Sequence, residues 1–211
     1  MPPFFLQCGT MDVAVRELQP AELPAAVALV ARGMRDNPLN VQAMGMNAEA
    51  RLSRLQAMFA AVLPMTARKG SMLGTFDDGH LVGVLAWVPS GRCQATLGEK
   101  VALAARMVPR IGVGALLRIA RGQGDWEKRD PAETHWHLGR VSVDSGLRGR
   151  RIGSALMANY CARLDAERVC SYLETDKAEN LRFYAKFGFS SVAEAKVLGV
   201  SNWFMVRPAG A

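Results

Sequence analysis

VSVDSGLRGRRIGSAL, the stretch from residue 141 to residue 156, decides the fold. The alternation of apolar and polar residues over 136–143 predicts a strand. The spacing over 153–168 predicts a helix, and the loop between the two elements is short, basic and rich in glycine. An apolar strand therefore runs into a tight basic loop that opens a helix.

This loop is suited to a phosphate or a pyrophosphate. At a helix N-terminus the first backbone N–H groups have no partner inside the helix, and the helix dipole favours negative charge there. Gly149 and Gly153 let the backbone come close to an anion, and Ser154 adds a hydroxyl donor. Charge-assisted hydrogen bonds would come from Arg148, Arg150 and Arg151. On this segment alone, a turn with arginines pointing into solvent stays an alternative. The patterns of a P-loop and of a dinucleotide-binding loop are both absent.

The stretch from Arg148 to Gly153 resembles the signature of the GNAT superfamily of N-acetyltransferases: Arg or Gln, two residues, Gly or Ala, one residue, Gly or Ala. Arg151 departs from this signature, because it stands where the family has Gly or Ala. The resemblance implies a loop that holds the pyrophosphate of coenzyme A. It also implies that a backbone N–H at or near Val143 stabilises the oxyanion. The implied cofactor contacts are Val141, Val143, Arg148, Gly149, Arg150, Arg151, Ile152, Gly153 and Ser154.

A second pattern follows in the chain. LET at 173–175, NLRFY at 180–184 and KFGF at 186–189 resemble the strand, helix start and aromatic-glycine motif of the same family. Asn180 and Tyr184 are four residues apart, so they share one helix face. The resemblance implies that Asn180 binds the pantetheine arm, and that Phe183 and Tyr184 contact the cofactor, with Tyr184 as the general acid beside the thioester sulfur. Taken singly, Tyr184 would be a core residue and Asn180 a helix N-cap. Because the two patterns occur in the family's order, together they favour a coenzyme A site over these structural roles.

No motif identifies the base that takes a proton from the amine. His135 and His137 stand at the start of the long strand and fall on one face if alternation holds, so both are candidates. A strand histidine is more often a hydrogen-bonded structural residue. Asp144, Glu174 and an ordered water are weaker alternatives.

The rest of the chain predicts a mixed α/β fold with a largely antiparallel sheet flanked by helices. Strands are predicted over 12–18, 72–76, 80–88, 171–175, 191–198 and 203–206, and helices over 22–34, 47–68 and 178–187. Pro64 is expected to kink the second helix or end it early. Segment 97–121 should form one or two helices, broken at Pro109, Gly112 and Gly114, and 122–133 should be a loop. The order is β-α-α-β-β, a helical insertion at about 92–130, then β-α-β-α-β-β.

Length and composition fit one globular domain. Of the 211 residues, half are hydrophobic; 1–10 read as a loose leader and 11–211 as a single acyltransferase domain. The net charge of +7 favours acidic ligands. The apolar stretch 101–119 contains arginines and a proline, so it should not span a membrane.

The four cysteines show no metal-binding pattern. They are Cys8, Cys93, Cys161 and Cys170, and they form no close pair and have no metal-like spacing with the histidines. They indicate reduced thiols in a cytoplasmic protein without a metal.

These features favour an acetyl-CoA-dependent N-acetyltransferase that moves an acetyl group directly from CoA to a primary amine of a small molecule. The N-terminal helices and the insertion should wall the acceptor pocket. A protein or peptide N-acetyltransferase and a non-catalytic acyl-CoA sensor are the alternatives, and a sensor would need no acid at Tyr184. We expect a monomer or homodimer with no nucleic acid and no membrane as partner.

Overall fold

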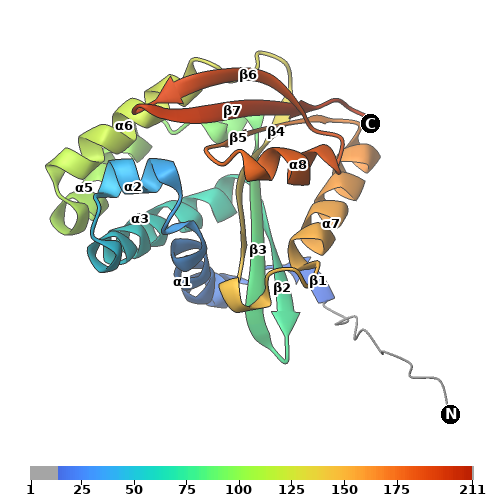
Figure 1. The fold of residues 1–211 in the computed structure, drawn as a ribbon, viewed down its shortest axis with the longest axis horizontal. Coiled ribbons are helices and arrows are strands. Elements are labelled where there is room, and N and C mark those ends of the chain that lie inside the picture. The colour runs from blue at the N-terminus through green and yellow to red at the C-terminus, as the bar shows by residue number, and fades with distance from the viewer. Residues whose placement is uncertain (1–13, 211) are drawn as a thin grey trace, which may run out of the picture.

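A seven-stranded sheet organises residues 14–210, the part of the chain that the computed structural model describes (Figure 1). Its strands in chain order are β1 (Ala14–Glu17), β2 (Ser71–Asp77), β3 (His80–Pro89), β4 (His135–Val143), β5 (Cys170–Thr175), β6 (Ser190–Val197) and β7 (Val200–Arg207). Across the sheet the order is β1-β2-β3-β4-β5-β7-β6. Every neighbouring pair is antiparallel except β4 with β5. The predicted mixed, largely antiparallel sheet is confirmed.

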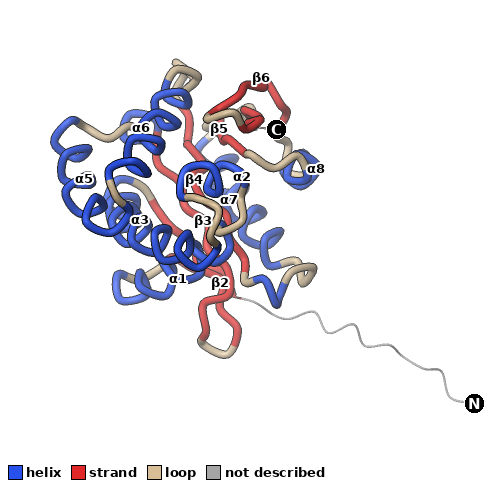
Figure 2. The backbone as a smooth tube through the Cα atoms, turned by 60° about the vertical axis from the view of Figure 1, so that its left-hand side comes forward, coloured by secondary structure: helices blue, strands red, loops and turns tan. Residues whose placement is uncertain are grey.

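Helices cover both faces of this sheet. They are α1 (Leu23–Met34), α2 (Pro38–Met44), α3 (Ala48–Lys69), α4 (Ser90–Cys93), α5 (Leu97–Ile111), α6 (Val113–Glu127), α7 (Ile152–Glu167) and α8 (Glu179–Ala185). In Figures 1 and 2, α5 and α6 lie together with α3 on one side of the molecule, and α8 lies on the other. α7 and α8 share a core with the opposite face of the strands.

The strand pattern explains the two cores. Successive residues of a strand point to opposite faces. Met72 and Val84 therefore pack against α1 and α3, while Leu73 and Leu85 pack against α7. On α3 the residues Leu55, Phe59 and Leu63, spaced by four, are all buried against the first face.

Some sequence expectations for the helices were wrong. α3 continues through Pro64 to Lys69, because the buried apolar side chains that precede the proline, Phe59 and Leu63 among them, hold the helix on the sheet. α5 contains Pro109 and ends only before Gly112, whose φ is +80°, and Gly114 lies inside α6. α6 extends to Glu127 into the segment expected to be a loop. The sequence also missed α2, which begins at a proline, and the short α4.

One close contact sets α1 over the middle of the sheet. A Cβ placed on Gly33 would meet the Ser142 hydroxyl of β4 and force it to rotate, so glycine allows the close approach seen here. The C-terminal end of α1 and the segment after it therefore lie directly over β4.

No helix within residues 14–210 is both long and apolar enough to cross a membrane. The stretch 101–119 is divided between α5 and α6. The proposed leader, 1–10, and the start of the first predicted strand lie outside the described residues, so the division of the chain stays a prediction.

Candidate active site

The site begins where the two central strands separate. Residues 135–137 of β4 pair with residues 170–172 of β5, and the parallel ladder stops there. Beyond this point β4 remains paired with β3 as far as Val143, and β5 remains paired with β7 as far as Thr175. A register shift in the β3–β4 ladder leaves Gly139 unpaired, and such a bulge bends a strand. A gap therefore opens between the ends of β4 and β5.

Backbone N–H groups of β4 point into this gap. The Asp144 N–H donates to the Val82 carbonyl of β3 at 2.9 Å. Because N–H directions alternate along a strand, the N–H groups of Val141 and Val143 point away from β3 and toward the gap. These are the two strand residues that the sequence singled out.

The loop after β4 exposes further N–H groups. Asp144 accepts a hydrogen bond from the Gly146 N–H at 2.9 Å and closes the turn Ser145–Leu147. Gly149 follows with a φ of +81°. The first bond of α7 runs from the Ala155 N–H to the Arg151 carbonyl at 2.9 Å, so the N–H groups of residues 152–154 have no helical partner. An anion can bind there.

Arg151, which stands where the signature has Gly or Ala, adopts a strained backbone conformation. Its φ is +62°, in the left-handed region, immediately before α7. A side chain in that region costs about 1–2 kcal/mol, which glycine would avoid. The arginine adopts the backbone shape that the loop needs and leaves its exposed guanidinium beside the N-terminus of α7.

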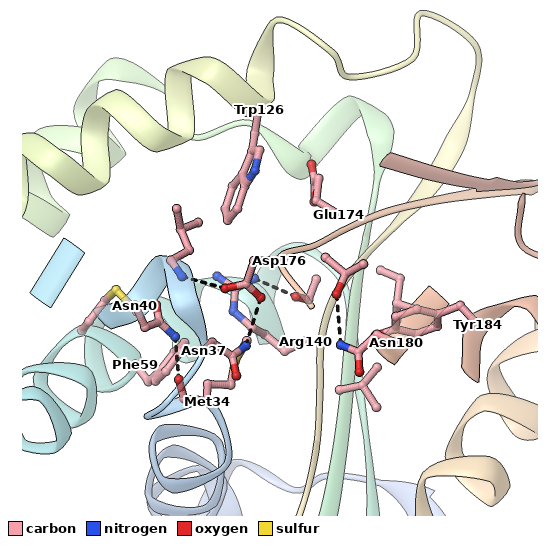
Figure 3. A pocket seen from close by; sticks show the side chains of 16 residues that line it. Met34, Asn37, Asn40, Phe59, Trp126, Arg140, Glu174, Asp176, Asn180 and Tyr184 are labelled. Atoms are coloured by element: carbon pink, nitrogen blue, oxygen red, sulfur yellow. Dashed lines mark hydrogen bonds between the residues drawn. The ribbon is translucent and has the colours of Figure 1, made fainter. Parts of the chain in front are cut away.

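Two connected cavities follow the gap from the loop inward. The first has a volume of about 310 Å³ and is lined by Val141, Val143, Arg148 and Asn180 among others. The second, of about 100 Å³, lies deeper and is shown in Figure 3. Both are lined by Met34, Asn37, Val141 and Asn180, so they form one cleft along β4.

Asn180 and Tyr184 of α8 lie on the same side of the cleft, as their spacing predicted (Figure 3). Asn180 donates from Nδ2 to Thr175 Oγ1 at 3.0 Å, and it lies inside α8, not at the N-cap, which is Ala178. Burial raises the pKa of the Tyr184 phenol, and the Asp176 charge raises it further. Tyr184 therefore keeps its proton at neutral pH. Phe183 packs edge-on against Tyr184, with ring centroids 5.3 Å apart.

The inner cavity is acidic at its far wall. Glu174 and Asp176 both line it, and Asp176 is fixed because it accepts a hydrogen bond from the Leu39 N–H at 2.8 Å. Arg140 also lines this wall; burial lowers its pKa, and the Glu174 charge opposes that shift. Trp126 closes the cavity and donates from its indole N–H to Asn202 at 3.3 Å. The two carboxylates can accept hydrogen bonds from an amine, and the positive charge of Arg140 partly offsets theirs.

The two histidines lie behind this wall. As expected, they share one face of β4, with ring centroids 6.3 Å apart. Neither lines the inner cavity, and His137 reaches it only through Glu174, whose Oε2 lies 2.8 Å from His137 Nε2. Burial lowers the pKa of His137, but the charges of Glu174 and Asp130 and a contact with Cys93 outweigh burial and raise it to about 10. At neutral pH this imidazole holds a proton and is not a free base.

Sequence reasoning missed several residues at the far wall of the inner cavity. Asn37 was interpreted only as part of a break after the first helix, and Leu39 and Asp176 were not singled out. Asp176 follows β5 directly and is the residue on which Asn37 and Leu39 converge. A carboxylate just after a central strand was the one signal that could have identified it.

Comparison with known proteins agrees with this architecture. The sequence model of the acetyltransferase (GNAT) family matches residues 51–189. A histone acetyltransferase HPA2 and related acetyltransferase from Corynebacterium glutamicum superposes with a TM-score of 0.72 at 23% identity, over 95% of this chain and 98% of that chain. The arylalkylamine N-acetyltransferase 2 of Aedes aegypti gives 0.59 at 12% identity, over 93% and 99%. The PaiA N-acetyltransferase of Thermoplasma acidophilum, in complex with coenzyme A, gives 0.58 at 12% identity, over 94% and 99%. At these identities the likeness shows a shared fold.

Proposed function

This chain belongs to the acetyltransferase (GNAT) family, and we propose that it transfers an acetyl group directly from acetyl-CoA to a primary amine of a small molecule. One observation carries the proposal. A single cleft along β4 joins a basic loop at a helix N-terminus to an acidic cavity of about 100 Å³.

The outer part of the cleft fits coenzyme A. The pyrophosphate would be held by the unpaired N–H groups at the start of α7, by Gly149, Gly153 and Ser154, and by the exposed Arg148, Arg150 and Arg151. The pantetheine arm would bind along Val141 and Val143, whose N–H groups face the gap, and beside Asn180. A bound thioester supplies an activated acetyl group, and the Val143 N–H is suited to stabilise its carbonyl oxygen as negative charge develops.

Tyr184 is suited to act as the general acid. Its raised pKa means that it carries a proton to give when the carbon–sulfur bond breaks and the sulfur leaves with a negative charge. The bond that forms joins the amine nitrogen to the acetyl carbon, and the products are the acetylated amine and free coenzyme A.

The acceptor would bind at the acidic wall. Glu174 and Asp176 attract an ammonium group, and Trp126 and Phe59 supply apolar surface for the rest of a small amine. His135 and His137, our candidate bases, contact the cleft only through Glu174. We therefore assign the amine contact to the carboxylates, with water as the route by which the amine loses its proton.

Calorimetric titration of the purified chain with acetyl-CoA tests the cofactor, with 3′-dephospho-CoA and ATP as controls. Saturable binding that needs the pantetheine arm supports the proposal, and no binding at low or high salt contradicts it. A panel of small amines and short peptides, assayed by release of free thiol, then tests the acceptor. If only the peptides are acetylated, the acceptor is a protein or peptide and not a small molecule.

Gly153→Val is expected to weaken acetyl-CoA binding by about 100-fold or more, a loss of about 2.7 kcal/mol. A Cβ at Gly153 lies 3.5 Å from both Phe183 and Val143, an ordinary contact, so the backbone accepts a Cβ here and the methyl groups of valine project beyond it. It would fill the space between these two residues, where the cofactor must approach the backbone. Calorimetry measures the change.

Gly98→Val is the matched control, because Gly98 is also the second residue of a helix and has open space around it. It should bind acetyl-CoA as the unmodified chain does. Unchanged affinity of Gly153→Val, with an unchanged melting temperature, would remove the loop from the cofactor site.

Asp176→Asn is expected to raise KM for the best amine of the panel at least tenfold while acetyl-CoA affinity stays constant. The amide oxygen of Asn can still accept the Leu39 N–H, so the cavity wall keeps its shape while it loses one negative charge. Steady-state kinetics give both quantities. Asp77→Asn, in the β2–β3 hairpin far from the cleft, is the control, and an equal rise in KM for both variants would contradict the assignment.

A further inference from the structure

A second cluster of side chains lies behind Glu174, on the far side of the acceptor wall. Cys93 of α4, Asp130 in the segment after α6, and His135 and His137 of β4 each offer one atom, and these atoms all lie within 4.8 Å of one another. Cys93 Sγ is 3.3 Å from Asp130 Oδ2, His135 Nε2 is 3.2 Å from Asp130 Oδ1, and His137 Nδ1 is 3.8 Å from the same oxygen. Ligand atoms bound to tetrahedral zinc at about 2.0–2.3 Å are separated by about 3.3–3.8 Å.

His135 directs its second ring nitrogen at this cluster. Its Nδ1 lies 2.8 Å from the Glu133 carbonyl oxygen, which can only accept, so Nδ1 carries the proton. In the neutral ring Nε2 then points a lone pair at an oxygen of Asp130. The two atoms are within ion-pair distance, yet both are buried and neither has a hydrogen-bond partner. His135 is only 2% exposed, so no bulk water satisfies this nitrogen.

His137 also has one ring nitrogen held by a partner and the other directed at Asp130. Its Nε2 is held by the Glu174 carboxylate at 2.8 Å, and its Nδ1 is directed at Asp130. An imidazole that donates to a carboxylate through one nitrogen and faces a shared point with the other has the arrangement of metal-binding histidines. Both histidines thus have their outer nitrogen fixed and direct their inner nitrogen at Asp130. A metal ion that binds here would displace the proton that His137 holds at neutral pH.

The space and the charge suit one metal ion. A cavity of about 10 Å³ is lined by Cys93, Asp130, His137 and Glu174, which is room for one ion or one water and too little for an organic ligand. A thiolate and a carboxylate balance the charge of a divalent cation, and the imidazoles would bind it in their neutral form, with protons released as the metal binds. Sulfur and nitrogen donors in a set of four favour zinc over magnesium or calcium.

We propose that Cys93, Asp130, His135 and His137 bind one Zn²⁺ ion, with Glu174 as the outer hydrogen-bond partner of His137. Four protein ligands complete a tetrahedral shell, so the site is structural. It would join α4 and the segment after α6 to the start of β4, and so fix both ends of the helical insertion whose Trp126 closes the acceptor cavity.

The test uses the full chain, stripped of metal with a chelator and titrated with Co²⁺ and then Zn²⁺. We expect one equivalent to bind, with the visible absorption of tetrahedral cobalt and a near-ultraviolet thiolate-to-cobalt band, and Zn²⁺ to displace it. Zinc should also raise the melting temperature. Cys93→Ser should abolish the thiolate band and the shift in melting temperature, and Glu174→Gln should weaken zinc binding about 10–100-fold.

Cys170→Ser is the matched control, because it removes the same group from the neighbouring strand and should leave the cobalt spectrum unchanged. Three results would overturn the proposal: no stoichiometric binding, an octahedral cobalt spectrum without a thiolate band, or binding that survives both Cys93→Ser and Asp130→Asn. None of these measurements depends on catalysis, so they separate this site from the acetyltransferase assignment.

Discussion

Tyr184→Phe is expected to lower kcat by about 100-fold or more while acetyl-CoA affinity stays nearly constant. The substitution removes one oxygen from a side chain that is 9% exposed, so the ring contacts of residue 184 with Phe183 and Phe189 are preserved. Only the proton for the leaving sulfur is lost. Steady-state kinetics with the best amine, together with calorimetric titration of acetyl-CoA, separate the two quantities.

Tyr160→Phe provides the control for this variant. It makes the same chemical change in a buried tyrosine of α7 that hydrogen-bonds Ser171 at 2.8 Å and does not line the cleft. We expect a lower melting temperature and unchanged kcat. Because burial raises the pKa of Tyr184 above its usual 10.0, kcat of the unmodified chain should not fall through loss of this proton at any pH below 10. Equal turnover by Tyr184→Phe would end its assignment as general acid.

The largest effect on stability is expected from Arg51→Ala, at about 3–4 kcal/mol. The Arg51 side chain on α3 is 5% exposed and donates to three backbone carbonyls, at 2.7–2.9 Å. These carbonyls belong to Arg35, Gly45 and Met46, so one guanidinium ties the ends of α1 and α2 to α3. Its fourth contact, with Asp36 at 2.7 Å, adds little because that carboxylate is 56% exposed.

Thermal and urea unfolding measure this loss, and the melting temperature should fall by roughly 10 °C. Arg68→Ala, at an exposed position of the same helix, controls for the removal of an arginine and should change stability by less than about 0.5 kcal/mol. Since α2 and the segment before it carry Asn37 and Leu39, Arg51→Ala should also weaken amine binding more than acetyl-CoA binding. A melting temperature within a degree or two of the unmodified chain would contradict this account.

The sequence predicted the elements around the basic loop and α8 far better than the far wall of the cleft. Local patterns fix the loop from Arg148 to Gly153 and the spacing of Asn180 and Tyr184, because each lies within one strand–loop–helix unit. Strand alternation also placed His135 and His137 on one face correctly. The sequence predicted a mixed, largely antiparallel sheet, but neither the order of its strands nor the parallel β4–β5 pair.

The acceptor wall depends on contacts between distant segments, which no local pattern encodes. Asp176 meets Asn37 and Leu39 across more than 130 residues. Cys93 meets Asp130 across 37 residues, so a search for metal-like spacing could not find this cluster. Pro64 and Pro109 were overestimated as breaks, since tertiary packing preserves both helices.

The gap between β4 and β5 has a consequence for redesign of the enzyme. Its two inward N–H groups belong to the main chain, and pairing with β3 holds them in place whatever side chains stand at 141 and 143. Libraries that vary α2, α6 and the residues after β5 would therefore search acceptor preference without disturbing that strand. Directed evolution toward new amines can therefore vary one end of the cleft while the other end is kept unchanged.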